Sequence, residues 1–89
     1  MINFSIQFGY NKILYTAIVH KIPAADRFPL QYLVSDFSPE IHNAPPVFIY
    51  DPEKETFEFG ALTLMHVNLA GKIIKAIKDY CIENEIALV

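Results

Sequence analysis

The chain has 89 residues, 53% of them hydrophobic and 19% charged, and it carries a formal net charge of −3 at pH 7. We expect one domain over residues 1–89, because this length is typical of a single small domain and the composition is too apolar for a disordered chain. The acidic balance disfavours general nucleic-acid binding, and the single cysteine excludes an intramolecular disulfide and a multi-cysteine zinc site.

The first part of the chain predicts a hairpin of two strands. Residues 2–8 alternate apolar with polar side chains, which is typical of a strand with one buried and one solvated face. Residues 9–12 contain Gly and Asn and predict the turn. Residues 13–22 follow as a strand that is apolar on both faces. Such a strand is either covered on both sides or has one face in an interface.

A third strand is predicted over residues 30–36, and the longest irregular stretch follows it over residues 37–46. In that stretch Ser38-Pro39 is typical of a helix start, with Ser as the N-cap and Pro at the first helical position. We therefore expect one helical turn over residues 39–42.

Residues 47–60 predict a second hairpin. Asp51-Pro52 is the signature of a type I turn, and four-residue hairpin loops are often built around such a turn. The second strand of this hairpin carries Glu58, and Glu55 precedes it. These carboxylates discourage pairing with another sheet, so the pattern favours an edge strand.

The only long helical pattern lies in residues 68–84, where apolar residues recur at three- and four-residue spacing. We expect the helix to begin at Asn68, a good N-cap, and to end at Asn84 in the left-handed conformation. Residues 61–67 fit either a short strand or an extra turn or two of the same helix, capped by Thr63.

These elements predict an α+β fold, in which an antiparallel meander of four to five strands carries one C-terminal helix packed across one face. The last five residues are mostly apolar. We expect them to dock beneath the helix, at a sheet edge or on another chain. The expected core consists of Phe4, Ile6, Phe8, Val34, Phe57, Ile73, Ile77 and Tyr80.

The surplus of aromatic and apolar side chains is the strongest functional signal. One helix covers one face of a sheet, and tyrosine is enriched at interfaces, so we expect tyrosines on the face away from the helix to form a binding surface. Ordinary cross-strand packing is the alternative. On the first hypothesis the chain is a small cytoplasmic interaction module that buries its sheet face or edge in a homodimer or a protein partner. The candidate interface residues are Tyr10, Tyr15, Tyr32, Tyr50 and, in the apolar tail, Leu88.

A second hypothesis is a small ligand-binding domain or enzyme that uses the segment 36–46. Asp36, Glu40 and His42 lie there, and carboxylates beside an imidazole can hold a metal or perform acid–base chemistry. No recognised ligand spacing is present, and turn and capping roles explain the carboxylates equally well.

A third hypothesis is nucleic-acid binding through a basic helix face made by Lys72, Lys75 and Lys78. A solvated face with an i,i+4 pair between Lys75 and Asp79 explains the same residues. The acidic balance makes nucleic acid the least favoured partner.

The remaining motifs predict no bound cofactor and no metal. Gly71-Lys72 near the expected helix start suggests an anion site, but a phosphate loop needs two glycines and a Ser or Thr after the Lys. No signal peptide and no long apolar run are visible, so we expect a cytoplasmic protein without membrane contact. No catalytic motif is recognisable.

Overall fold

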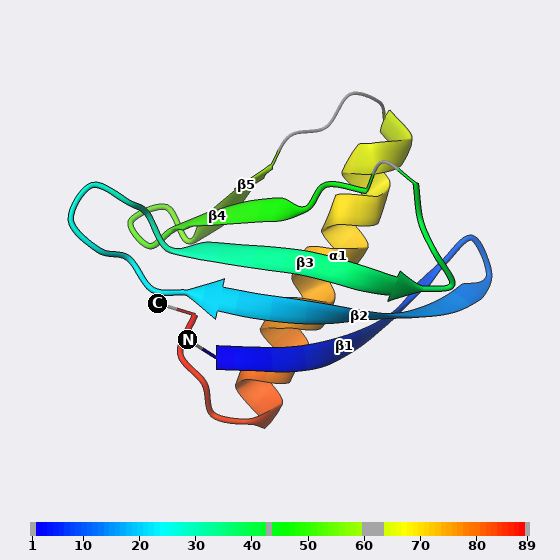
Figure 1. The fold of residues 1–89 in the computed structure, drawn as a ribbon, viewed down its shortest axis with the longest axis horizontal. Coiled ribbons are helices and arrows are strands. Elements are labelled where there is room, and N and C mark those ends of the chain that lie inside the picture. Colours follow the sequence, from blue (N-terminus) through cyan, green and yellow to red (C-terminus); the bar gives the residue numbers. More distant parts are fainter. Residues whose placement is uncertain (1, 43, 60–63, 89) are drawn as a thin grey trace.

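The computed structural model of this chain describes residues 2–42, 44–59 and 64–88. In this part of the chain, five strands form one antiparallel sheet in the order β1-β2-β3-β4-β5, and a single helix lies across one face (Figure 1). The α+β meander with one C-terminal helix is therefore confirmed. The elements are β1 (Ile2–Tyr10), β2 (Ile13–Ile22), β3 (Gln31–Ser38), β4 (Val47–Asp51), β5 (Thr56–Phe59) and α1 (Leu64–Glu83).

The turn between β1 and β2 is shorter than the sequence suggested. Asn11 and Lys12 both have left-handed backbones, with φ values of 52° and 64°, so the loop has two residues and the twist of a type I′ turn. This turn sets the register, in which Phe8 lies opposite Tyr15. Directly opposed residues point to the same face, so these two rings stack, with centroids 5.6 Å apart.

A bulge in β3 redirects its last residues. Asp36 has a φ of 55°, and the register with β2 shifts between the pairs made by Thr16 and Ile18. As a result Phe37 turns towards the core and meets Phe8 edge to face.

The helical turn expected over residues 39–42 is wrong. Ser38 pairs with Thr16 in the sheet and so cannot cap a helix, and the Ser38–Pro39 peptide is cis. The chain returns to the sheet beside β3, where the backbone N–H of Val34 donates to the carbonyl of Pro46 at 2.8 Å.

The second hairpin forms around the predicted turn. The carboxylate Oδ1 of Asp51 accepts hydrogen bonds from the backbone N–H groups of Glu53 at 3.0 Å and Lys54 at 3.4 Å. Glu55 closes the loop with a φ of 54°. β5 follows as an edge strand of the sheet, as its carboxylates suggested.

The predicted start of the helix at Asn68 is wrong. α1 begins at Leu64, so Asn68 lies in its second turn, where its N–H belongs to the helix rather than to an exposed end. The second reading of residues 61–67 is therefore right from Leu64 onwards, whereas Thr63 lies outside the described residues.

α1 ends at Glu83, and the left-handed residue that follows it lies one position later than predicted. Glu85, not Asn84, has the positive φ of 55°. The N–H of Ile86 donates to the carbonyl of Cys81 at 2.8 Å and that of Glu85 to Ile82 at 3.3 Å, which is the Schellman pattern. Asn84 instead uses its side-chain amide to cap the carbonyl of Tyr80.

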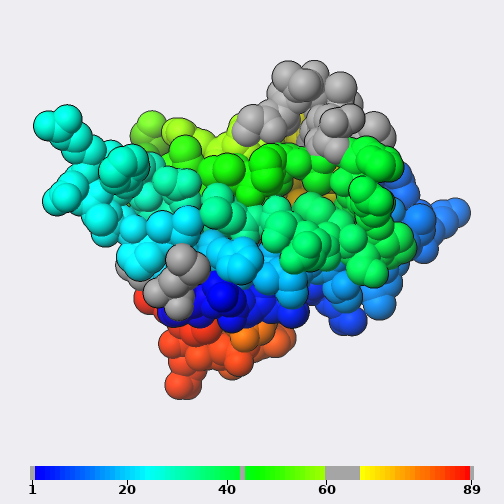
Figure 2. All heavy atoms as spheres, viewed as in Figure 1, coloured from blue at the N-terminus to red at the C-terminus, as the bar shows by residue number. Residues whose placement is uncertain are grey.

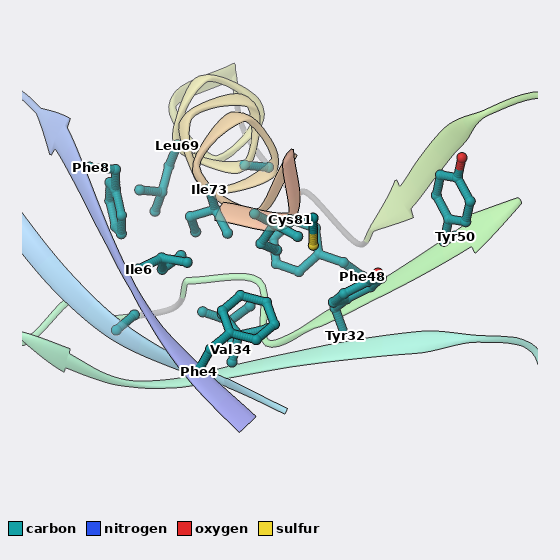
Figure 3. Packing of buried hydrophobic residues seen from close by; sticks show 14 of the residues in the cluster. Phe4, Ile6, Phe8, Tyr32, Val34, Phe48, Tyr50, Leu69, Ile73 and Cys81 are labelled. Carbon is teal, nitrogen blue, oxygen red and sulfur yellow. The ribbon is translucent and has the colours of Figure 1, made fainter. Parts of the chain in front are cut away.

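The core fills the space between α1 and the sheet (Figure 3). Six of the eight expected core residues are buried, and the other two, Phe57 and Tyr80, are partly buried and pack against them. The rings of Tyr80 and Phe4 stack with centroids 4.2 Å apart, which fixes the C-terminal half of α1 against β1.

Candidate functional site

The tyrosines predicted to form an exposed surface lie on the opposite side of the sheet. Tyr15, Tyr32 and Tyr50 are 9%, 0% and 6% exposed and belong to the core that α1 covers. The register explains this placement, because Tyr15 must share the face of Phe8 and Tyr50 lies opposite Phe57. The placement on the open face is therefore wrong, and cross-strand packing accounts for these rings.

Leu88 also packs against its own chain. The hydroxyl of Tyr32 donates to the carbonyl of Leu88 at 2.7 Å, and the ammonium of Lys21 donates to the carbonyl of Ala87 at 2.6 Å. The side chains of Ile86 and Leu88 are partly buried against the core. The tail therefore docks on its own chain, against residues of β2 and β3 on the face of the sheet that α1 covers.

Beneath this tail, polar groups are enclosed by apolar ones. Burial raises the pKa of the Tyr32 hydroxyl well above its usual range, and burial also raises the pKa of the Cys81 thiol. The positive charge of Lys21 acts on Cys81 in the opposite direction but is outweighed. Both groups thus stay protonated and neutral near pH 7, which suits hydrogen bonding and not nucleophilic chemistry.

The polar cluster predicted in the 36–46 segment is only partly assembled. Glu40 and His42 approach each other at 3.9 Å, but both side chains are at least 80% exposed. Asp36 is exposed at the bulge of β3. Within the described ranges, no group of three His, Cys, Asp or Glu side chains is placed to hold a metal.

Two of the three lysines of the predicted basic face make contacts, and the two contacts differ. Lys75 forms the expected pair with Asp79 at 2.9 Å, and the Lys78 ammonium lies 5.9 Å from the ring centre of Phe57. Lys72 is exposed. The suggested anion site at Gly71-Lys72 is wrong, because this dipeptide lies inside α1 and not at its start.

The face of the sheet away from α1 carries a cluster of aliphatic side chains that the sequence reasoning missed. They alternate with the buried residues of the three central strands and do not belong to the core. In the described part of the chain no helix lies over this face, which Figure 2 shows directly. We call this cluster the outer apolar patch; it consists of Ile18, Ile22, Leu33, Val47 and Ile49.

The register brings the patch together. Leu33 lies between His20 and Val47, and Ile49 lies across Gln31 from Ile22. The signal that could have found it was the two-residue turn at Asn11. That turn assigns one face of β2 to the core and leaves the other outside.

A separate apolar hollow of about 580 Å³ opens where β1 begins and β2 ends. Its volume is in the range of small-molecule sites. The loop after β2 forms one wall and is held by two backbone hydrogen bonds between Ala25 and Phe28. Lys21 and Tyr50 are its polar members, and the apolar lining consists of Ile2, Pro23, Ala24, Pro29, Leu30 and Pro52.

The chain matches no protein-family model, no curated protein and no solved structure closely enough to be placed in a family. Among the described elements, no helix is both long and apolar enough to cross a membrane.

Proposed function

We propose that this chain is a protein–protein interaction module that forms a homodimer through the outer apolar patch. The observation that carries the proposal is the position of the patch at the centre of a sheet face that no described helix covers. Val47 is exposed and the other four side chains of the patch are partly exposed, and apolar side chains clustered on the surface of a small protein favour an interaction site. The strand β2, apolar on both faces, then has one face in the core and one in the interface.

The charge of the patch favours a second copy as the partner. Its cross-strand neighbours are polar but mostly uncharged, such as His20 and Gln31. Glu58, opposite Ile49, is the one carboxylate among the neighbours in the described ladders. Two copies with a net charge of −3 each can therefore meet here without placing acidic groups at the centre of the contact.

The size of the face is sufficient for such a dimer. With strands about 4.8 Å apart and a rise of about 3.3 Å per residue, the sheet presents a flat area of roughly 600 Å². Each partner of a standard complex buries roughly 800 Å² of accessible surface, and side chains make accessible surface larger than its flat projection. Two sheets packed face to face in this way form a sandwich with one helix on each outside.

The experiment that tests this function is molar mass by light scattering over about a hundredfold dilution, since association follows mass action. We expect a dimer that dissociates on dilution. Leu33→Glu, which places a charge at the centre of the patch, should leave a monomer with an unchanged circular dichroism spectrum.

The matched control is Thr56→Glu, which adds the same charge to the same face but on the edge strand β5. It should leave the dimer intact. A monomer at every concentration, or a dimer unaffected by Leu33→Glu, would contradict the proposal.

The apolar hollow beside Lys21 favours a second function, the binding of a small apolar molecule. Anilinonaphthalene sulfonate is a suitable probe, because it combines an aromatic body with an anionic group. We expect saturable fluorescence that Ala24→Trp abolishes by filling the hollow, whereas Ala25→Trp, outside the lining, leaves it unchanged. Equal fluorescence from both variants would contradict this function.

A further inference from the structure

We propose that the free edge of β1, together with the flank of α1, binds an extended segment of another protein as a sixth strand of the sheet. This inference goes beyond the homodimer, because it uses the edge of the sheet and not its outer face.

The outer edge of β1 carries a row of backbone hydrogen-bonding groups that no described strand uses. β1 is an outside strand and pairs only with β2 among the described elements. Hydrogen-bonded and non-bonded pairs alternate along an antiparallel ladder, and the tight turn closes on a bonded pair between Tyr10 and Ile13. The N–H and C=O groups that point away from β2 therefore belong to Asn3, Ser5, Gln7 and Gly9.

These groups have no backbone partner in the described chain outside the sheet. β1 also lacks the features by which proteins protect an edge, since its nine residues contain no charge and no proline. Its register with β2 runs without a bulge from Ile2 to Tyr10. The other edge differs, because β5 has four residues, one of them Glu58.

A groove follows this edge on the side of the helix. One hollow of about 500 Å³ lies between Ser5 and Gln7 on the strand and Ala76 and Asp79 on α1. A second, of about 320 Å³, shares Gln7, Ala76 and Asp79 with the first and continues to Gly9. Figure 1 shows the C-terminal half of α1 crossing behind β1. The small Ala76 leaves room at the middle for a side chain of the bound segment.

The helix makes the two ends of the groove electrically different. Glu83 and Asp79 line it at the Ser5 end, and Lys72 and Lys75 line it towards Gly9. Because Lys75 and Asp79 pair with each other, Glu83 and Lys72 define the ends.

This polarity identifies the chemistry of the partner. A second copy of β1 has no charge to offer either end. A segment that runs antiparallel to β1 complements both ends of the groove when it carries an acidic residue near Lys72 and, further along, a basic residue near Glu83. The two residues are separated by the same number of positions as Ser5 and Gly9. Both side chains then point to the same face, as the two-residue period of a strand requires. Main-chain hydrogen bonds supply the affinity and the charges supply the direction.

The probe for this site is a synthetic threonine-rich peptide with Glu and Lys at that spacing, Glu first, titrated at low salt into the labelled protein. In two-dimensional NMR we expect the largest amide shifts at Asn3, Ser5, Gln7 and Gly9. Gln7→Pro removes an outward N–H at an edge, where proline is tolerated, and should weaken binding at least about tenfold. N-methylation of the peptide backbone should do the same without changing the protein.

Charge reversal tests the direction. Glu83→Lys should weaken binding up to about fivefold, and a peptide with Glu at both positions should recover it. Glu53→Lys makes the same change in the distant turn and should have no effect.

Three results would overturn the proposal. The first is the absence of amide shifts along β1 at millimolar peptide, and the second is binding that neither Gln7→Pro nor N-methylation weakens. The third is loss of the dimer on Gln7→Pro, which would assign the edge to a second copy. Leu33→Glu should leave peptide binding intact, so failure of the homodimer and failure of the edge site are distinguishable.

Discussion

At the scale of single residues, one residue inside α1 and one just after its end suit the local backbone poorly. Gly71 lies inside the helix, where glycine loses more conformational entropy on folding than alanine does. Glu85 takes the left-handed conformation that glycine adopts without penalty. Within the described residues, neither of the two makes a contact that explains its presence, so both positions offer direct tests of the local geometry.

The first test is Gly71→Ala. A Cβ at this position meets nothing within 4 Å, so the substitution should raise the free energy of unfolding by about 0.5–1 kcal/mol. Urea denaturation followed by circular dichroism measures the change. A loss of stability would mean that a neighbour occupies this space.

The second test is Glu85→Gly, which should stabilise the fold by about 0.5–1 kcal/mol, because it removes the steric cost of the left-handed backbone. Glu83→Gly is the matched control. It makes the same substitution inside the last turn of α1 and should destabilise by a similar amount. The same effect from both variants would contradict the assigned helix end.

The third test concerns alkaline pH. Cys81 has a raised pKa in the folded protein, so its contribution to stability is complete below the unfolded pKa of 9.0 and is lost as the pH rises through the folded value. The free energy of unfolding should therefore fall as the pH rises past the unfolded pKa, at which half of the unfolded thiols have lost their proton. Cys81→Ala should make this fall shallower, whatever its effect at pH 7. An unchanged slope would show that other groups, such as Tyr32, account for the decline.

At the scale of elements, the spacing of apolar side chains predicted the strands and the helix. It did not predict which face of β2 enters the core. Both faces of β2 are apolar, and the face that enters the core carries Lys21, the residue that periodicity would place in water. The tail makes this possible, because the carbonyl of Ala87 accepts a hydrogen bond from the buried ammonium. A contact between residues so far apart in the sequence cannot be predicted from the local pattern of apolar and polar residues.

The tail contact gives the prediction at this scale. Tyr32→Phe removes the hydroxyl that donates to Leu88 and should lower the free energy of unfolding by about 1 kcal/mol. It should also speed amide exchange in residues 86–88. Tyr50→Phe is the control, because the Tyr50 hydroxyl makes no hydrogen bond to the described part of the chain, and it should change stability by less. Equal effects of the two variants would show that the hydrogen bond between Tyr32 and Leu88 does not stabilise the fold.

At the scale of the whole molecule, the one helix among the described elements lies on one side of a five-stranded sheet, and these elements leave the other side and one long edge uncovered. The sequence was sufficient for the layer arrangement and for six buried core residues, because these depend on local period and turn chemistry. It was insufficient for the candidate surface. Tyr15 and Ile18 lie on opposite faces of β2. Which of these faces enters the core depends on the two-residue turn at Asn11 and Lys12.

The order of the elements along the chain also affects its synthesis. All five described strands precede α1, and a ribosome adding roughly 5–20 residues per second needs on the order of seconds to make the 20 residues of the helix. Until α1 is available, the side chains that it will cover, such as Phe4 and Val34, remain accessible to other chains and to chaperones. The nascent sheet is therefore most vulnerable to misassembly just before the helix emerges, when neither of its faces is covered.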